Sequence, residues 1–227
     1  MANEHNKQTN RRCKINVKNH LRPFVVAAMA LGLAACQSGS TVSETLSIEK
    51  AQGSAENIAS LNRVIAQQPR NASAYNTRGN AYGKSGQYRP AIQDFTRAIQ
   101  INPRYHQAYN HRALAYRALG QQQQALNDYN SAIKLDPSYD AAYVGRGNLY
   151  RQSGQTASAL RDFERAIQLG SNDARVYFYR GIILQSQRNH VAALEDFSTS
   201  IKLDRRAAPP LARRGYSYLA LNDQTNA

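Results

Sequence analysis

The sequence predicts an all-α protein, a solenoid of antiparallel helix pairs, and three observations lead to this fold class. Residues of one type recur with a step of 34, most visibly in the column Arg78, Arg112, Arg146, Arg180 and Arg214. Each period holds two stretches with the apolar spacing of an amphipathic helix, separated by a turn such as Gly86-Gln87. Several periods close with a proline that ends a helix, at Pro69, Pro103 and Pro137. Each period is thus expected to be one helix–turn–helix unit that buries its apolar faces against its neighbours.

Residues 1–35 precede these units and have the residue order of a secretory signal. Six Lys and Arg side chains are followed by an uncharged run from Phe24 to Ala35. This run of 12 residues is too short to cross a bilayer core of about 30 Å as a helix. We therefore expect residues 1–35 to be a signal peptide.

The signal ends in Leu33-Ala34-Ala35-Cys36, which resembles the lipobox of bacterial lipoproteins. In that family the Cys thiol is joined to diacylglycerol, the preceding peptide is removed, and the Cys becomes an acylated first residue. The resemblance implies that Cys36 is the lipidation site and that the protein is anchored in the bacterial cell envelope. Gln37 stands where the family's inner-membrane retention signal would be Asp, which favours the outer membrane and its periplasmic face. The alternative is a cysteine that merely ends an apolar segment.

Residues 36–45, rich in Ser and Thr, are the expected tether between the lipid and the solenoid. Residues 46–71 are expected to form a degenerate N-terminal capping repeat, since 55–68 repeat the pattern of a second helix and stop before Pro69. Residues 41–52 are the candidate for its first helix. Four complete units follow, and residues 208–227 form an incomplete fifth unit that holds a first helix only. The complete units are 72–105, 106–139, 140–173 and 174–207.

The period and its residue types resemble the tetratricopeptide repeat (TPR) over about residues 54–223. In the first unit we expect helices over about 72–85 and 89–100. Small residues stand where the family's helices approach most closely, and aromatic residues fill the space beside them. Columns of this kind are Gly79, Ala113, Gly147 and Gly181; Ala91, Ala125, Ala159 and Ala193; and Phe95, Tyr129, Phe163 and Phe197. The resemblance implies a right-handed superhelix whose first helices line a concave groove.

Every complete repeat carries an Arg in its first helix and an Asp 16 residues later in its second helix. The common family pattern has Leu at the Arg position. A guanidinium fork binds a carboxylate well, and buried charges are normally paired. We therefore expect structural pairs, within a repeat or between neighbours, although a ladder of Arg side chains that binds an anionic polymer is the alternative. The residues are Arg78 and Asp94, Arg112 and Asp128, Arg146 and Asp162, and Arg180 and Asp196.

In TPR proteins the groove is lined by defined positions of each first helix, and mapping them onto this chain gives candidate partner-binding residues. They are Asn76, Asn80, Lys84, Gln107, Asn110, Arg117, Asn148, Arg151, Gln152, Phe178 and Ile182. The first three repeats supply amides, which suit the main chain of an extended peptide, and cations, which suit its carboxylates. From Val144 onward the positions are mainly apolar and could accept an anchor side chain. The alternative is a solvated surface at one end and an unfinished packing face at the other.

No catalytic constellation is recognisable, and we expect a protein that is not an enzyme and has no cofactor. The only cysteines are Cys13, within the signal, and Cys36. The histidines outside the signal, His106, His111 and His190, lack the spacing of metal ligands. We therefore expect no metal site.

The net charge narrows the choice of partners. The chain carries +14, and subtracting the +5 of residues 1–35 leaves +9 on the remainder. An exported lipoprotein meets little nucleic acid, so anionic lipids, glycans or acidic proteins are the expected counter-charges.

The leading hypothesis is a lipid-anchored periplasmic adaptor for a protein or peptide partner. It is similar to outer-membrane TPR lipoproteins that serve an envelope protease or a cell-wall hydrolase. The alternative is a structural component of an exopolysaccharide or cell-wall system that contacts an anionic glycan. Because the fifth unit lacks a second helix that would cover its first, a homodimer through residues 208–222 is a further hypothesis.

Overall fold

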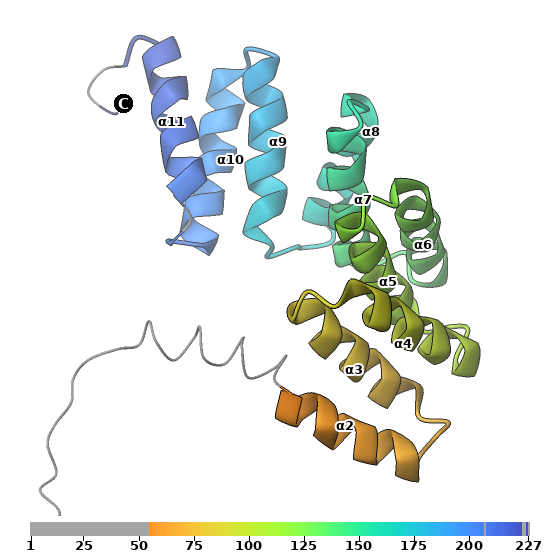
Figure 1. Ribbon diagram of the computed structural model, residues 1–227. Helices are drawn as coiled ribbons and strands as arrows, with labels where there is room; N and C mark the ends of the chain where they lie inside the picture. Colours follow the sequence, from red (N-terminus) through yellow and green to blue (C-terminus); the bar gives the residue numbers. More distant parts are fainter. Residues whose placement is uncertain (1–54, 207, 224–225, 227) are drawn as a thin grey trace, which may run out of the picture. The chain divides into compact units, whose positions relative to one another are not determined.

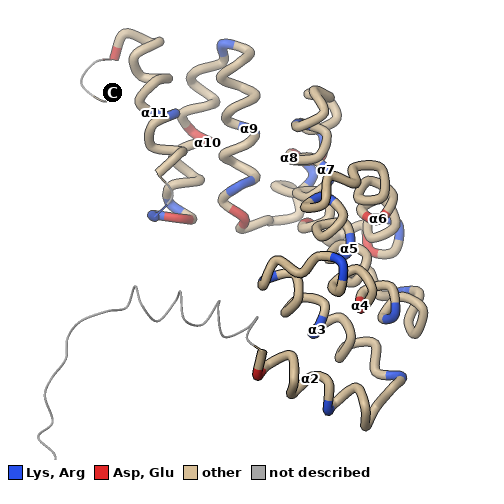
Figure 2. The backbone as a smooth tube through the Cα atoms, in the orientation of Figure 1, with Lys and Arg blue, Asp and Glu red and all other residues tan. Residues whose placement is uncertain are grey.

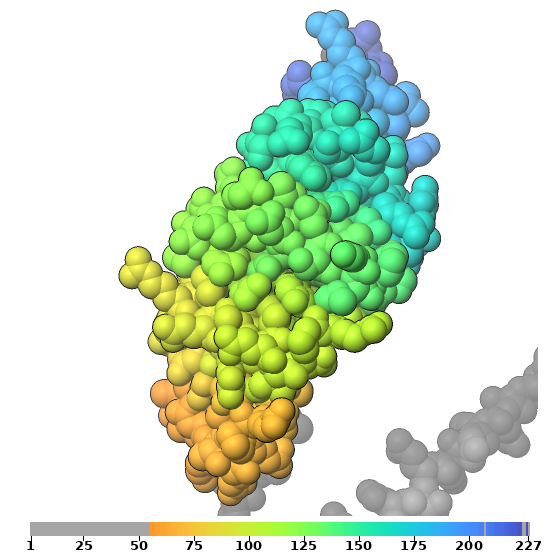
Figure 3. All heavy atoms as spheres, turned by 90° about the vertical axis from the view of Figure 1, so that its right-hand side faces the viewer, coloured from red at the N-terminus to blue at the C-terminus, as the bar shows by residue number. Residues whose placement is uncertain are grey.

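The computed structural model describes residues 55–206, 208–223 and 226, and this part of the chain is all-α. The expected signal peptide, Cys36, the tether and the first helix of the capping repeat lie outside the described residues. The helices follow one another in sequence order from α2 to α11 (Figures 1 and 3). Their bounds are α2 Ala55–Gln67, α3 Ala72–Lys84, α4 Tyr88–Ile101, α5 His106–Ala118, α6 Gln122–Leu135, α7 Asp140–Gln152, α8 Thr156–Gln168, α9 Ala174–Ser186, α10 His190–Leu203 and α11 Ala208–Ala220.

The helices form antiparallel pairs, α3 with α4, α5 with α6, α7 with α8, and α9 with α10. α2 packs on α3, and α11 packs on α10, so each pair contacts its neighbours in the sequence. The fold class expected from the sequence is therefore confirmed: the described chain is an all-α solenoid of helix pairs. In the first pair, the first helix ends at Lys84 rather than at Ser85, and the second spans Tyr88–Ile101 rather than 89–100.

The two helices of a pair approach closely because a small residue on one faces an aromatic ring on the other. A Cβ atom added to Gly79 would lie 2.6 Å from Cε1 of Phe95, and one added to Gly181 would lie 2.7 Å from Cε1 of Phe197. The aromatic column Phe95, Tyr129, Phe163 and Phe197 is almost fully buried. The core is thus a series of buried rings, one in each complete repeat.

The junction between α8 and α9 differs from those after α4, α6 and α10. After these three helices the backbone extends at Asn102, Asp136 and Asp204, and each side chain accepts a hydrogen bond from the backbone N–H two residues later. After α8, Gly170 adopts a left-handed backbone with φ of 80°, and the N–H of Ser171 donates to the carbonyl of Ala166. This glycine-based cap replaces the proline seen after α4 and α6.

The exposed face of α11 carries several large apolar side chains. Leu211, Tyr216 and Leu219 on this helix and Leu221 just after it are between 44% and 59% exposed, whereas Ser217 on the same helix is fully buried. Gln185 of α9 donates hydrogen bonds to the Ser217 hydroxyl and to the carbonyl of Arg213. One face of α11 is therefore held by α9 and α10. Across the described residues, no helix is both long and apolar enough to traverse a bilayer.

Candidate peptide-binding groove

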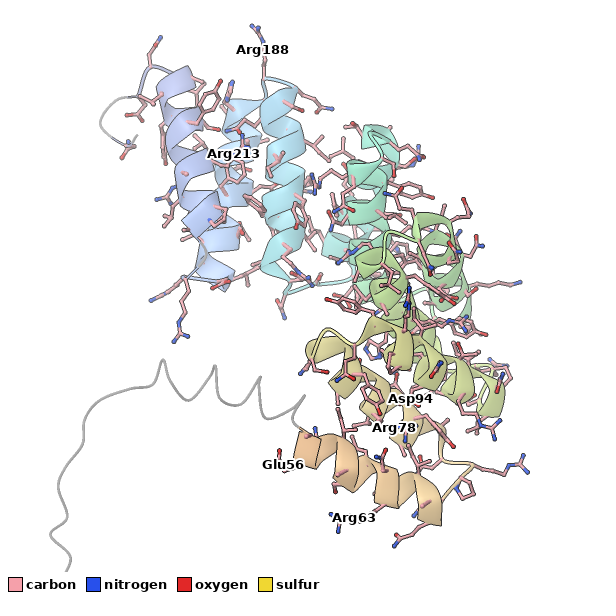
Figure 4. The ribbon with its side chains drawn as sticks, in the orientation of Figure 1. Glu56, Arg63, Arg78, Asp94, Arg188 and Arg213 are labelled. Atoms are coloured by element: carbon pink, nitrogen blue, oxygen red, sulfur yellow. The ribbon has the colours of Figure 1, made fainter. Side chains whose placement is uncertain are left out.

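The Arg and Asp columns meet in all four complete repeats. Arg78 donates from Nε and Nη2 to the two carboxylate oxygens of Asp94 at 2.7 and 2.6 Å, and Figure 4 shows these side chains pointing toward one another. The equivalent pairs are Arg112 with Asp128, Arg146 with Asp162, and Arg180 with Asp196, at 2.7–2.8 Å. Each pair lies within one repeat, and each Asp is at most 5% exposed. This geometry favours the structural pair over a ladder of free guanidinium groups.

The third guanidinium nitrogen connects each of the first three complete repeats to the helix before it. Nη1 of Arg78 donates to Asn62, that of Arg112 to Thr96, and that of Arg146 to Asn130, at 2.7–3.0 Å. Hydrogen bonds to the Asp partners raise the pKa of Arg78, Arg146 and Arg180. For Arg112, burial lowers the pKa, but the hydrogen bond and charge of Asp128 outweigh that effect. These arginines therefore stay charged and bound within the scaffold.

At the N-terminal end of the groove, Asn76 is buried and both ends of its amide are engaged. Its Oδ1 lies 2.9 Å from Nδ1 of His111, and its Nδ2 donates to the hydroxyl of Tyr105 at 3.3 Å. Asn80 lies 3.3 Å from the same His111 nitrogen. Burial lowers the pKa of His111 to about 4, so the ring is neutral near pH 7. The structure therefore places Asn76 in the scaffold and not on the surface that a peptide would contact.

Beside this cluster lies a pocket of about 370 Å³ with mainly apolar walls. It brings together the predicted groove residues Asn80 and Lys84. The residues that line it are Asn80, Gly83, Lys84, Tyr88, Phe95, His111, Leu114 and Ala115.

A second pocket, which we call the central pocket, lies between α5, α7 and the start of α9. It holds about 60 Å³ and is lined by Asn110, Leu114, Arg117, Ala141, Val144, Gly145, Asn148, Asp173, Arg175 and Tyr179. It brings together three predicted groove residues, Asn110, Arg117 and Asn148, from two successive first helices. Arg151 adjoins it, because its guanidinium donates to Oδ1 of Asn148 at 3.0 and 3.2 Å and lies 4.5 Å from the ring centre of Tyr179.

Two buried polar atoms, one on α5 and one on α6, have no hydrogen-bond partner among the described residues. They are Oδ1 of Asn110, which is 4% exposed, and the hydroxyl of Tyr129, which is fully buried. Burial raises the pKa of Tyr129 to about 12, while the charges of Arg117 and Arg175 act in the opposite direction. Tyr129 was expected only as a core aromatic. The signal that could have singled it out is that the three other complete repeats have Phe in this column.

The remaining predicted groove residues lie outside both pockets. Gln107 is half-buried on α5, and Gln152 is exposed at the end of α7. Phe178 is half-buried on α9, with its ring centre 6.2 Å from that of Phe197 and 5.4 Å from that of Tyr179, so this side chain contributes to packing. Ile182 is half-buried one turn further along α9.

Charge along the described chain is dominated by Lys and Arg (Figure 2). The described residues contain no group of three or more His, Cys, Asp or Glu side chains that could hold a metal ion. The central pocket offers amide, hydroxyl and guanidinium groups, which bind main-chain and carboxylate groups of a ligand.

Stacked helix pairs with polar pockets along their first helices define a protein-interaction scaffold built from repeats. The chain belongs to the tetratricopeptide repeat family. Models described as "Tetratricopeptide repeat" match residues 72–105 and 95–127, and one described as "TPR repeat" matches 113–150 and 147–187. No curated protein sequence matches the chain.

Solved structures share the fold at low sequence identity. PilF of Pseudomonas aeruginosa is 17% identical with a TM-score of 0.70, over 81% of this chain and 84% of its own. The thermophilic TPR protein TTC0263 of Thermus thermophilus is 19% identical with a TM-score of 0.63, over 78% and 93%. YrrB, described as a TPR protein with an unusual peptide-binding site, is 18% identical with a TM-score of 0.58, over 77% and 87%.

Proposed function

We propose that this protein is a lipid-anchored, non-enzymatic adaptor that binds partner proteins through the groove along α3, α5, α7 and α9. The observation that carries the proposal is the central pocket, where side chains from three successive first helices surround one small cavity. A scaffold needs no such convergence for its stability, and pockets with a few converging polar groups are typical binding sites. The peptide-binding TPR protein YrrB, which has this fold, supports the same class of function.

The groove suits an extended peptide better than a compact ligand. Its two pockets differ in chemistry, since the one beside Lys84 is mainly apolar and the central one is lined by amides and guanidinium groups. An extended chain can place an apolar side chain in the first and polar groups in the second. Envelope proteases and cell-wall hydrolases are the partner classes that the outer-membrane location suggests.

The proposed anchor and location rest on Cys36 and Gln37. We expect that Cys36→Ser abolishes acylation, because Cys36 is the sole candidate acceptor outside the signal. Metabolic labelling with a fatty-acid analogue and fractionation of the cell envelope measure both properties. Label that persists in the variant would contradict the lipoprotein assignment, and label confined to the inner membrane would contradict the outer-membrane location.

Capture of partners from detergent-solubilised envelopes tests the adaptor function. We would compare the full chain with Lys84→Ala/Arg151→Ala, which alters the groove at two places. The matched control is Arg97→Ala/Arg165→Ala, which removes two cations from the second helices α4 and α8, where both are exposed. A defined partner that is retained by the control and lost by the groove variant supports the proposal.

The same comparison separates the glycan-binding alternative. Binding to an anionic polymer depends on total charge and falls similarly for both variants. The full chain would then retain cell-wall polymer or exopolysaccharide without a co-purifying protein, and polymer binding would fall equally in the two variants. This outcome would contradict the adaptor function and favour a structural component of a glycan system.

A further inference from the structure

We infer that a pocket between the loop after α4 and the end of α6 binds a phosphate group, carried by a phospholipid headgroup or free in solution. We call it the α6 pocket. None of its residues belongs to the predicted groove, and the inference rests on the proposed function in one respect, because the lipid anchor would bring this surface to a membrane. The pocket holds about 360 Å³ and is lined by Pro103, Arg104, Tyr109, Ser131, Lys134 and Leu135.

Two cations meet at the α6 pocket. Arg104 lies in the loop between α4 and α5, and Lys134 lies in the last turn of α6. Both residues are exposed, and neither forms an ion pair with any described residue. A guanidinium binds phosphate through its fork and an ammonium binds it as a point charge. The two together therefore suit a group that offers several anionic oxygens.

The 34-residue period shows that this combination is particular to one place in the chain. At the other equivalent pairs of positions, one residue at most is cationic. The meeting of two cations is thus not a by-product of the repeat. The equivalent pairs are Arg70 with Gln100, Ser138 with Gln168, and Asn172 with Lys202.

The same comparison explains why there is space beside Lys134. Ser131 lies three residues before it on α6, whereas the equivalent residues on α4 and α8 are Arg97 and Arg165. The Ser131 hydroxyl donates to the carbonyl of Asn127 at 2.9 Å, so this short side chain is held against its own helix. An arginine at this position would place its long side chain where the pocket lies.

The hydroxyl of Tyr109 is a further donor at the pocket. Tyr75 and Tyr143, at the equivalent positions, each donate to the carbonyl of a proline, at 3.4 and 3.2 Å. Tyr109 makes no such bond to Pro103 within the described chain, although both residues line the pocket. Its hydroxyl can therefore donate to an oxygen of a phosphate group.

The acidic residue closest in sequence to Lys134 is engaged elsewhere. The carboxylate of Asp136 accepts hydrogen bonds from the N–H and the hydroxyl of Ser138 at 2.9 and 2.6 Å. Its second oxygen lies 3.4 Å from Nε2 of His106. Asp136 thus leaves the positive charge of the α6 pocket available to an external anion.

The size of the pocket admits more than a bare phosphate ion. Its volume of about 360 Å³ corresponds to roughly twelve water molecules at about 30 Å³ each. Pro103 and Leu135 form an apolar part of the wall. A phosphate ester can place its anionic oxygens on the cations and its carbon atoms against these two side chains.

Titration of the 15N-labelled full chain in micelles of a non-ionic detergent, followed by the amide signals of Ser131 and Leu135, tests the inference. The phosphate probes are inorganic phosphate, glycerol 3-phosphate and dihexanoylphosphatidylglycerol. Acetate is the carboxylate control, and dihexanoylphosphatidylcholine controls for the acyl chains. We expect saturable shifts with at least one phosphate probe and at least about fivefold weaker binding of acetate, which has fewer oxygens for two cations.

The order of affinities identifies the source of the phosphate. Tighter binding of phosphatidylglycerol than of glycerol 3-phosphate and phosphatidylcholine supports a lipid headgroup. Tighter binding of inorganic phosphate supports free phosphate. Acetate that binds as tightly as every phosphate probe, or the lack of a saturable shift at Ser131 and Leu135, would overturn the inference.

Arg104→Gln/Lys134→Gln should weaken the preferred phosphate probe at least about fivefold, because two ion pairs are lost. The matched control is Lys202→Gln/Arg206→Gln, which removes the same charge from exposed positions of the same two columns and should leave the affinity unchanged. Equal losses in the two variants would show that binding follows net charge and would overturn the site.

Tyr109→Phe should weaken the same probe at least about twofold, because one hydrogen bond to the ligand is lost. It should leave the melting temperature unchanged, because the hydroxyl has no partner in the scaffold. An unchanged affinity of Tyr109→Phe would contradict the site as described. Fatty-acid labelling at Cys36 and partner capture through Lys84 and Arg151 are separate measurements, so the anchor and the adaptor function can stand or fail without the α6 pocket.

Discussion

Arg112 and Asp128 show how charged residues can lie within a helical scaffold. The guanidinium is held by two hydrogen bonds to Asp128 and a third to Thr96 at 3.0 Å, and it lies between the rings of Tyr109 and Tyr116. Breaking a buried pair from one side leaves an uncompensated charge. Replacing both partners by apolar residues removes that charge altogether.

We therefore expect Asp128→Leu to lower the free energy of unfolding by about 3–5 kcal/mol. In the double variant Arg112→Leu/Asp128→Leu, the free energy of unfolding should fall by clearly less than the sum of the decreases in the two single variants. Urea denaturation of the wild type, both single variants and the double variant measures the coupling. Simple additivity would show that the pair does not interact in solution and would favour free guanidinium groups.

His111 links the stability of the fold to pH. Burial lowers its pKa from 6.5 to about 4, so between these values the unfolded chain binds the proton more readily than the folded one. The contribution of His111 to the free energy of unfolding is therefore fully present above pH 6.5, and it is lost as the pH is lowered toward 4. This shift in the pKa of His111 corresponds to a change of roughly 3 kcal/mol in the free energy of unfolding.

We expect His111→Gln to remove this dependence while leaving that of the carboxylates in place. The difference in unfolding free energy between wild type and variant should change by roughly 3 kcal/mol between pH 7 and pH 4. Urea denaturation at several pH values measures it, with His106→Gln as the control. A difference that stays constant over this range would show that His111 is not held neutral in the folded protein.

At the scale of helices, close packing within a pair depends on glycine where a ring lies opposite. A Cβ atom on Gly147 would lie 2.8 Å from Cε1 of Phe163, whereas one on Gly83 has no atom within 4 Å. Both glycines lie within helices, where Ala is intrinsically favoured over Gly by about 0.5–1 kcal/mol. The two positions therefore separate helix propensity from packing.

Gly147→Ala should destabilise the protein by about 1–3 kcal/mol through overpacking. Gly83→Ala should stabilise it by about 0.5–1 kcal/mol, because only propensity changes. Chemical denaturation of both variants gives the comparison. Equal effects of the two substitutions would mean that α7 and α8 separate easily and that the approach of the helices is not set by Gly147.

At the scale of the whole molecule, half of the large exposed apolar residues of the described chain lie on α11 or directly after it. Leu211, Tyr216 and Leu219 of α11 and Leu221 just after it are 44–59% exposed, although the ring centre of Tyr216 lies 6.3 Å from that of His190 on α10. Burying such a side chain fully is worth roughly 1.5–3 kcal/mol. A second copy of the chain could provide that burial through the same helix.

We accordingly expect self-association through residues 208–222, or, in a monomer, faster amide exchange there than in 106–173. Light scattering and hydrogen exchange measure the two properties. Tyr216→Ser/Leu219→Ser should abolish the dimer, whereas Val191→Ser, at the exposed N-terminal end of α10, should not. A monomer in which 208–222 is as protected as the central repeats would contradict this expectation.

The period of 34 residues determined the helices, their pairing and the placement of each Arg near its Asp. These features could be predicted because they depend on side chains at constant spacing within one repeat, where the same geometry recurs four times. Asn76 and Asn110 show what such reasoning cannot decide. Both occupy the same position of a repeat, and both were expected to contact a peptide.

Only the tertiary structure separated them, because their surroundings come from the following repeat. His111 lies beside the oxygen of one amide, whereas Gly145 stands at the corresponding position for the other, whose oxygen has no partner among the described residues. Hydrogen bonding and burial depend on residues some 35 positions away, beyond the reach of helical periodicity. The sequence by itself thus determined the scaffold, and the packing of one repeat on the next decided which of its buried polar groups are satisfied.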